Sequence, residues 1–228
     1  IERSSGHATS ARDSAALLAR QAIALADSSG QAELRTEALL NMGYAYYRWS
    51  ALDSARHYDQ QALAVSREAG YTRGTGRALN RLGNVLWLQD DQAAAKIRYE
   101  EARAIHVALD DPQEIGRSLN NLATVYREWG EYQQAIQLYL EARTQYERAG
   151  YGEGVAWLDF SLTILHKKLG NLERALEAIT ASLATYRELA AQSGDSAGVM
   201  ICYGQLGDIH DQMGDPERGL DYHLRALR

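Results

Sequence analysis

The sequence predicts an all-α fold, an α-solenoid in which helix-turn-helix hairpins stack one on the next. The main observation is a period of forty residues, which separates Gly30, Gly70, Asp110 and Gly150. Alanines keep the same period at Ala55, Ala95, Ala135 and Ala175, and at Ala62, Ala102 and Ala142. With only 2 prolines in 228 residues, the composition favours helix throughout. A fixed period of this length is typical of a stacked array, which needs no single deep core.

Each forty-residue unit divides into two predicted helices. In the third unit the first helix covers 112–129, Gly130 interrupts it, and the second covers 131–149. Steps of three and four residues place the apolar side chains of the second helix on one face, at Ala135, Leu138, Tyr139, Ala142 and Tyr146. The alanines in register indicate close packing of neighbouring helices, although alanine is also a good helix former.

The predicted helix ends also keep the register. The breaks within the hairpins fall at Ser50, Asp90, Gly130 and Gly170, where we expect a positive φ to end the helix. Pro112 follows Asp111 and Pro216 follows Asp215, which predicts an aspartate N-cap with proline at the first helical position.

We expect a disordered lead-in or linker at 1–10 and the second helix of a partial repeat at 11–30. Whole repeats follow at 31–70, 71–110, 111–150, 151–192 and 193–228. The period slips once, because Gly214 comes forty-four residues after Gly170, and the extra residues are expected at 190–198 as a longer loop or an additional turn. Both ends resemble interrupted repeats, which suggests a piece of a longer protein.

Charge and composition argue against several classes of protein. The formal net charge is -6, from 24 Lys and Arg against 30 Asp and Glu, so we expect no general attraction to nucleic acid or to an acidic membrane. No apolar run is long enough to span a bilayer. The single cysteine, Cys202, excludes an internal disulfide and favours a reducing, cytoplasmic setting. It stands at a packing position of a first helix, where a buried thiol is expected.

Signals for catalysis or metal binding are weak. The six histidines show no metal-ligand spacing, and His166 and His210 occupy equivalent packing positions. The segments GTGR at 74–77 and GEG at 152–154 resemble fragments of phosphate loops, but no strand precedes them, so we expect turns between helix pairs. We therefore expect no catalytic residues, no metal and no cofactor, and predict that this stretch is not an enzyme.

The repeated residues resemble the tetratricopeptide repeat family over residues 11–228. A large residue precedes a small one in the first helices, at Met42 and Gly43, Leu82 and Gly83, Leu122 and Ala123, and Leu206 and Gly207. Tyr99 and Tyr139 stand at the large position of the second helices, between the alanines that keep the forty-residue period. The forty-residue period, the missing proline after the second helix, and Asp159 with Thr163 in the fourth unit depart from the usual pattern.

The phrases ALNRLGNVL at 78–86 and SLNNLATVY at 118–126 are similar to repeats of kinesin light chains and of bacterial signalling regulators. The resemblance implies a right-handed solenoid whose first helices line a concave inner wall that binds proteins, peptides or small inducers. The residues that it places on that wall are Asn41, Tyr44, Tyr47, Arg77, Asn80, Arg81, Asn84, Trp87, Arg117, Asn120, Asn121, Thr124 and Arg127, followed by Trp157, Phe160, Ile164 and Lys167.

These side chains suit peptide binding. Asparagine carries donors and an acceptor for a peptide backbone, arginine matches carboxylates, and aromatic rings supply anchoring area. We therefore expect an acidic peptide, or one with a terminal carboxylate, across the second and third units. Two alternatives remain open: the polar residues are simply solvated or brace neighbouring helices, or Asn41, Arg77 and Arg81 form part of a carboxylate clamp.

The predicted function is a non-catalytic module that binds a protein or peptide, as the sensor or scaffold part of a larger regulatory protein. The alternative is a module for self-association, in which exposed helices pair between copies and give a homo-oligomer. Nucleic-acid binding is disfavoured by the net charge of -6.

Overall fold

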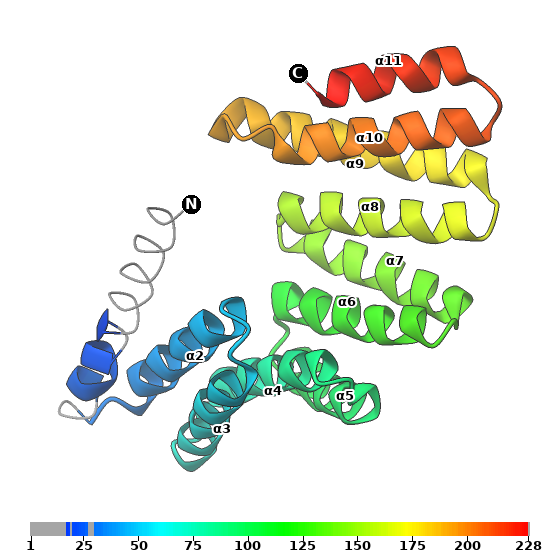
Figure 1. Ribbon diagram of the computed structural model, residues 1–228. Helices are drawn as coiled ribbons and strands as arrows, with labels where there is room; N and C mark the ends of the chain where they lie inside the picture. Colours follow the sequence, from blue (N-terminus) through cyan, green and yellow to red (C-terminus); the bar gives the residue numbers. More distant parts are fainter. Residues whose placement is uncertain (1–16, 19, 27–29, 228) are drawn as a thin grey trace. The chain divides into compact units, whose positions relative to one another are not determined.

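The computed structural model describes residues 17–18, 20–26 and 30–227 (Figure 1). The expected lead-in at 1–10 and half of the partial repeat at 11–30 therefore lie outside the described residues. From residue 30 onward helices alternate with short links, and the described part contains no strand. The helices are α2 (Ala32–Arg48), α3 (Leu52–Glu68), α4 (Thr72–Leu88), α5 (Gln92–Ala108), α6 (Pro112–Glu128), α7 (Tyr132–Arg148), α8 (Gly152–Lys168), α9 (Leu172–Ser193), α10 (Ala197–Gln212) and α11 (Pro216–Ala226).

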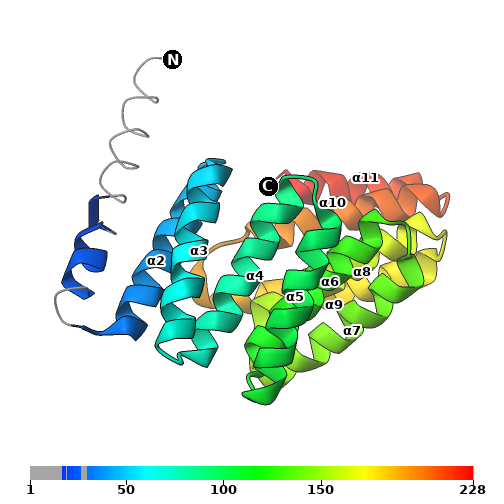
Figure 2. The same ribbon diagram turned by 90° about the horizontal axis from the view of Figure 1, so that it is seen from below.

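The chain divides into two compact units, residues 1–114 and 115–228, and the division falls in the first turn of α6. In unit 1, α3 packs against α2 and α4, α4 packs against α5, and the two first helices α2 and α4 also touch. In unit 2, α8 lies between α7 and α9, and α10 lies between α9 and α11. Figures 1 and 2 show successive helices running antiparallel within each unit. This stacking of hairpins confirms the predicted all-α repeat fold.

The forty-residue period follows from the lengths of the elements. Helices α2 to α8 each have 17 residues, and three residues separate each helix from the next. The expected positive φ values are confirmed: they are 58° at Ser50, 65° at Asp90, 79° at Gly130 and 73° at Gly170. The division of the chain into repeats at particular residues stays a prediction.

The expected helix starts are confirmed at both prolines. Asp111 Oδ1 accepts a hydrogen bond from the Glu114 amide at 3.3 Å, and Asp215 Oδ1 accepts one from the Arg218 amide at 3.2 Å. Of the two predicted explanations for the slip in period, the additional turn is correct. Helix α9 has 22 residues and ends at Gly194, whose φ is 77°.

Small residues let the paired helices approach closely. The alanines that keep the forty-residue register are fully buried, as the packing interpretation requires: Ala55, Ala95, Ala135, Ala175, Ala62, Ala102 and Ala142. The Tyr99 ring covers Gly83, where an added Cβ would overlap the ring. The pairing of a small with a large residue therefore sets the spacing within the hairpin.

The expected turns at GTGR and GEG are wrong. Residues 74–77 lie inside α4 and residues 152–154 begin α8, because the chain already turns at the preceding links. The glycines serve packing instead. A Cβ on Gly76 would overlap the His106 ring, and one on Gly154 would overlap Tyr146 and Tyr151.

The packing positions predicted for cysteine and histidine are confirmed. Cys202 is buried, and its Sγ lies 3.4 Å from Ser182 Oγ. Burial raises the pKa of the Cys202 thiol, which makes it a poor nucleophile. His166 and His210 are both buried, and burial lowers the pKa of His166 and so favours its neutral form.

Candidate functional site

In unit 1 the exposed side of α2 and α4 carries an aromatic and cationic cluster. The rings of Tyr44 and Tyr47 stack with centroids 6.4 Å apart, and the Arg81 guanidinium lies 4.9 Å from the Tyr44 centroid. Tyr44 is 46% exposed, and Asn41 is also exposed. We call this side, which carries Asn41, Tyr44, Tyr47 and Arg81, the first-helix face of unit 1. A large exposed ring with a cation stacked on it suits a partner that has both apolar and acidic groups.

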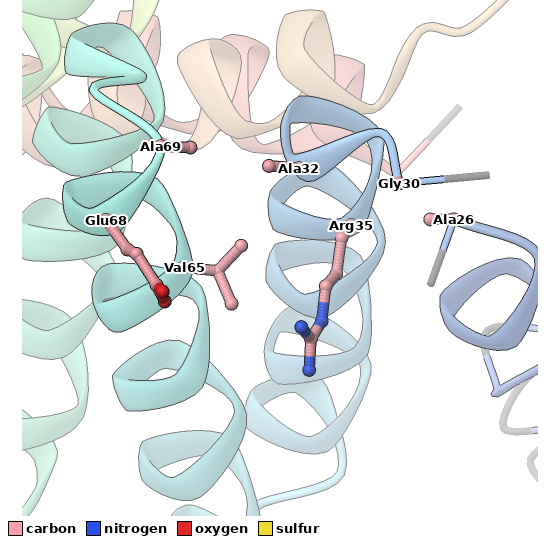
Figure 3. A pocket seen from close by; sticks show the side chains of 7 residues that line it. All are labelled: Ala26, Gly30, Ala32, Arg35, Val65, Glu68 and Ala69. Atoms are coloured by element: carbon pink, nitrogen blue, oxygen red, sulfur yellow. The ribbon is translucent and has the colours of Figure 1, made fainter. Parts of the chain in front are cut away.

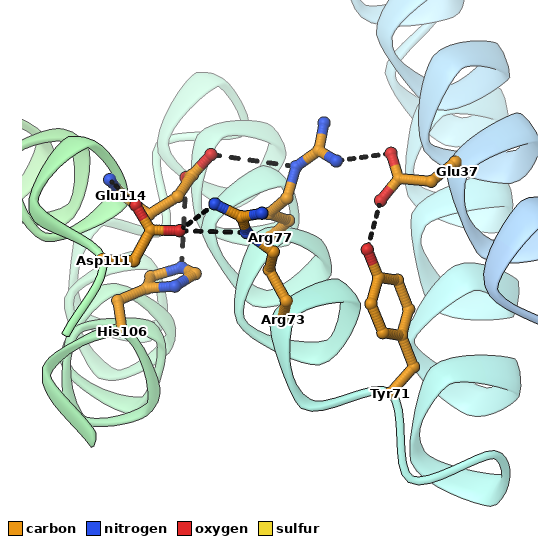
Figure 4. A network of polar contacts seen from close by, with 7 residues as sticks. All are labelled: Glu37, Tyr71, Arg73, Arg77, His106, Asp111 and Glu114. Carbon is orange, nitrogen blue, oxygen red and sulfur yellow. Dashed lines mark hydrogen bonds and ion pairs between the residues drawn. The ribbon is translucent and has the colours of Figure 1, made fainter. Parts of the chain in front are cut away.

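Arg77 lies in a network of carboxylates (Figure 4). Its Nη1 forms an ion pair with Glu37 Oε2, and its Nε lies 3.8 Å from Glu114 Oε1. The hydroxyl of Tyr71 donates a hydrogen bond to Glu37 Oε1 at 3.1 Å, and burial raises the pKa of that phenol. Arg77 is therefore already paired, and an acidic ligand would have to displace Glu37 to reach it.

The same network continues to the start of α6. Arg73 donates from Nε at 3.0 Å and from Nη2 at 2.6 Å to Asp111 Oδ2. The pKa of Asp111 is lowered, because the opposing effect of burial is outweighed by the Arg73 hydrogen bonds and charge together with the Glu114 amide. His106, fully buried, lies with Nε2 4.0 Å from Glu114 Oε2. The network therefore connects α4 with α2 through Arg77 and Glu37, and connects α4 with the link between α5 and α6 through Arg73 and Asp111.

The other predicted residues of α4 are less accessible. Asn80 is buried, and Asn84 accepts a hydrogen bond from the Tyr99 hydroxyl at 2.9 Å. Trp87 is half-buried. The Asn84 contact corresponds to the alternative in which asparagines brace neighbouring helices.

In unit 2 the predicted residues of α6 are half-buried and take part in local contacts. The Thr124 hydroxyl donates to the Asn120 carbonyl at 3.0 Å and lies 3.3 Å from the Tyr139 hydroxyl. Arg127 Nη2 pairs with Glu128 Oε1 at 2.8 Å. The remaining two predicted residues, also half-buried, are Arg117 and Asn121.

Helix α8, a first helix of unit 2, carries a cluster of apolar side chains. The rings of Trp157 and Phe160 stack with centroids 5.8 Å apart, and Trp157 is 51% exposed. Ile164, one turn further, is also exposed. Lys167 closes this side with its Nζ 3.0 Å from both Gln205 Oε1 and Asp208 Oδ2 on α10.

Sequence reasoning missed the carboxylates that accompany these cations. Glu37 and Arg77 are forty residues apart, so they occupy one register on neighbouring first helices. Arg73 and Asp111 are 38 apart, and Lys167 and Asp208 are 41 apart. Opposite charges about one period apart were the available signal for ion pairs between adjacent repeats.

A buried carboxyl group also escaped notice. Asp59 of α3 is 1% exposed, and its Oδ1 lies against Gly43 with no hydrogen-bond partner among the described residues. Burial raises the pKa of Asp59 to about 7, although the charge of Arg81 opposes this effect. Asp59 stands forty residues before Tyr99, at the position that resembling repeats fill with a large side chain.

A separate pocket of about 320 Å³ lies beside the start of α2 and the end of α3 (Figure 3). Its lining is mostly small and apolar. Arg35 projects from one wall and Glu68 from the other. One cation and one anion give no net attraction for a charged ligand.

The described residues hold no group of three or more His, Cys, Asp or Glu side chains arranged to bind a metal ion. A search of the same residues for a helix long and apolar enough to cross a membrane finds none.

The family comparison identifies the repeats. A tetratricopeptide repeat model matches residues 34–106 and 114–188, which is more than half of the chain. The chain therefore belongs to the tetratricopeptide repeat family, whose members are helical modules for protein interaction. A comparison with curated proteins gave no match.

Solved structures share the fold at low sequence identity. BtubC (BKLC) from P. vanneervenii has a TM-score of 0.83 and 19% identity, covering 96% of this chain and 90% of its own. RapI in its apo form has a TM-score of 0.67 and 19% identity, covering 95% and 92%. A Rap protein complexed with competence and sporulation factor has a TM-score of 0.64 and 17% identity, covering 85% and 63%.

Proposed function

We propose that the first helices bind an acidic or extended peptide segment of a partner protein, as the sensor or scaffold part of a larger regulatory protein. The observation that carries this proposal is the exposed aromatic surface on first helices of both units. Tyr44 lies beneath Arg81 in unit 1, and Trp157 stacks on Phe160 in unit 2. Exposed aromatic side chains flanked by arginine are typical anchors of protein interfaces.

The comparisons support the proposal at the level of the fold. A Rap protein of this fold has been solved with competence and sporulation factor bound, so the fold accommodates a ligand of that kind. In this proposal the cations of unit 1 hold the acidic ligand. The Arg81 guanidinium lies over the exposed Tyr44 ring, and Arg77 is paired with Glu37. We propose that Arg81 and Arg77 supply the electrostatic contacts of unit 1 and that Arg117 is the corresponding cation of unit 2.

The test is capture of a partner from the native host by photo-crosslinking. A photoreactive side chain replaces Tyr44 in one variant and Leu140, an exposed residue of the second helix α7, in the control. The proposal predicts a partner crosslinked from Tyr44 and not from Leu140. Affinity for that partner should fall at least about thirty-fold in Tyr44→Ala/Arg81→Ala and in Arg77→Ala/Arg81→Ala/Arg117→Ala, as expected for residues at the centre of an interface. Unchanged affinity in both would refute the assignment.

Self-association is a second candidate, favoured by one observation. Helix α11 exposes a stripe of leucines, with Leu220 60% and Leu224 47% exposed. Their spacing of four residues places them on one side of the helix, where two copies could pair. Sedimentation over a range of concentrations tests this candidate. A dimer that is lost in Leu220→Ser/Leu224→Ser supports it, and a monomer at every concentration refutes it.

A further inference from the structure

A groove between α3 and α5, the second helices of unit 1, has features of a second binding site. We call it the second-helix groove. Arg56 and Arg67 of α3 form one wall, Ile97 and Arg98 of α5 form the other, and Leu82 and Leu86 of α4 form the floor. Its volume is about 360 Å³. The first-helix residues proposed above do not line it.

The groove is cationic although the chain as a whole is acidic. Within the described part of the chain, neither Arg56 nor Arg67 forms an ion pair with a carboxylate. Arg98 pairs with Glu101 at 2.8 Å. The acidic lining residue, Asp91, caps its own helix by accepting a hydrogen bond from the Ala94 amide at 3.1 Å. The guanidinium groups of Arg56 and Arg67 are thus left for a carboxylate from elsewhere.

The spacing of these side chains has a helical pattern. Arg56, Gln60, Leu63 and Arg67 follow steps of four, three and four residues, so they form one stripe along α3. Eleven residues of helix separate the two arginines by about 16 Å along the axis. Leu63 lies between them, and Ile97 is 54% exposed on the facing wall. The groove therefore offers an apolar centre with a cation at each end.

The corresponding positions of unit 2 show that the fold does not require these cations. Eighty residues further along the sequence, Ile136, Glu147 and Ala178 replace Arg56, Arg67 and Arg98. The floor position of Leu82 is kept as Leu162, but Leu86 is replaced by His166. The apolar wall positions Leu63 and Ile97 are replaced by Arg143 and Glu177. Because the repeat fold forms in unit 2 with other residues at these positions, packing of the repeat does not explain the arginines of unit 1.

We propose that the second-helix groove binds an acidic amphipathic helix of a partner protein. Two apolar side chains of that helix would enter between α3 and α5 above Leu82 and Leu86. Two carboxylates about 16 Å apart, eleven residues along the partner helix, would pair with Arg56 and Arg67. The two charge pairs fix the register of the partner helix in the groove and also add affinity. A helix whose carboxylates have a different spacing cannot pair with both arginines.

The test uses a labelled synthetic helical peptide with two glutamates eleven residues apart and two leucines between them. Its control peptide has glutamine in place of both glutamates. Binding to the full chain is measured by fluorescence anisotropy at low and at high salt. The protein variants are Arg56→Glu/Arg67→Glu, its matched control Arg148→Glu/Arg174→Glu on the second helices of unit 2, and Ile97→Asn for the apolar wall. Circular dichroism verifies that each variant is folded.

We expect saturable binding of the glutamate peptide, weakened at least about ten-fold by high salt, by the control peptide and by Arg56→Glu/Arg67→Glu. Arg148→Glu/Arg174→Glu should bind as the unmodified chain does, and Ile97→Asn should weaken binding several-fold. Absence of saturable binding to the unmodified chain would overturn the proposal. So would equal loss in both charge-reversed variants. Tyr44→Ala/Arg81→Ala is measured with the same peptide, and loss only in that variant would overturn the proposal by placing the peptide on the first-helix face.

Discussion

Two hairpins differ at one equivalent position of their second helices. The hairpin of α2 and α3 in unit 1 has a carboxyl group there, whereas the hairpin of α6 and α7 in unit 2 has an aromatic ring. In unit 2 the buried Tyr139 stands there, and in unit 1 the buried Asp59 lies against Gly43. A large ring buries apolar area at every pH, whereas a carboxyl group without a full set of hydrogen bonds is tolerated best when protonated. The comparison teaches that the register of the repeat is kept even where both the size and the polarity of a buried side chain change. It also indicates that burying the Asp59 carboxyl group lowers the stability of unit 1 near its first-helix face.

The largest expected effect comes from placing the acid in unit 2. Tyr139→Asp removes a buried ring whose hydroxyl forms a hydrogen bond with the Thr124 hydroxyl, and it puts an ionised group in its place. We expect a loss of about 5 kcal/mol, because the lost packing and the buried charge add together. Hydrogen exchange across α6 to α8 would show the loss locally. Tyr139→Phe keeps the ring and should cost only about 1 kcal/mol. Unaltered protection in Tyr139→Asp would break the comparison.

The second effect is a pH dependence confined to unit 1. The folded pKa of Asp59 is about 7 against an ordinary 3.8. Below pH 3.8 the group is protonated in both states and carries no penalty. As the pH rises towards 7 the unfolded chain ionises first, so stability falls, and above 7 the full penalty remains. From a shift of about three units the penalty is roughly 4 kcal/mol at most.

Asp59→Asn is the variant that checks this dependence. It should abolish the fall in stability of unit 1 between about pH 4 and 7 and should stabilise unit 1 at pH 8. Urea titrations followed by hydrogen exchange in α2 and α3 provide the measurement. A fall in stability that persists in the variant would assign the pH dependence to another group.

The third effect concerns the buried acid of unit 2 that has a cation. Asp159 Oδ1 accepts from Arg143 Nε at 2.7 Å, and Arg143 moderates the increase in the pKa of Asp159 that burial causes. Arg143→Met should therefore destabilise unit 2 by about 3 kcal/mol at neutral pH, because it leaves a buried charge without its partner. The loss should disappear at low pH, where Asp159 is protonated.

Arg143→Met/Asp159→Leu is the matched control for that experiment. Leucine is the usual residue at this position in resembling repeats, so the double variant should recover most of the lost stability. Thermal unfolding at neutral and at low pH compares the variants. If the double variant is as unstable as Arg143→Met, the loss arises from packing of the arginine stem and not from the uncompensated charge.

Packing could be predicted from the sequence, whereas the polar partners could not. Period, helix breaks and the small positions at Gly83 and Ala123 all depend on local geometry and side-chain size, which repeat along the chain. The partner of Arg77 depends on which carboxylate of a neighbouring helix reaches it, and that requires the stacked structure. The turn predicted at GTGR was wrong for the same reason. Gly76 is needed there because it makes room for the ring of His106, thirty residues away. A contact with a distant ring leaves no local signal.

The smallest effect on stability, and the most direct on binding, is expected from Glu37. The ion pair of Glu37 with Arg77 is partly solvated, so Glu37→Gln should cost only about 0.5 kcal/mol, and less at high salt.

The same change leaves Arg77 paired only with the more distant Glu114, at 3.8 Å, and so makes it available to an incoming carboxylate. Affinity for an acidic partner on the first-helix face of unit 1 should then rise several-fold, while Glu68→Gln, on the second helix α3, should leave it unchanged. Calorimetry with the crosslinked partner compares the two variants. Equal affinities would mean that Arg77 stays part of the internal network when the partner binds, and that Arg81 alone supplies the charge in unit 1.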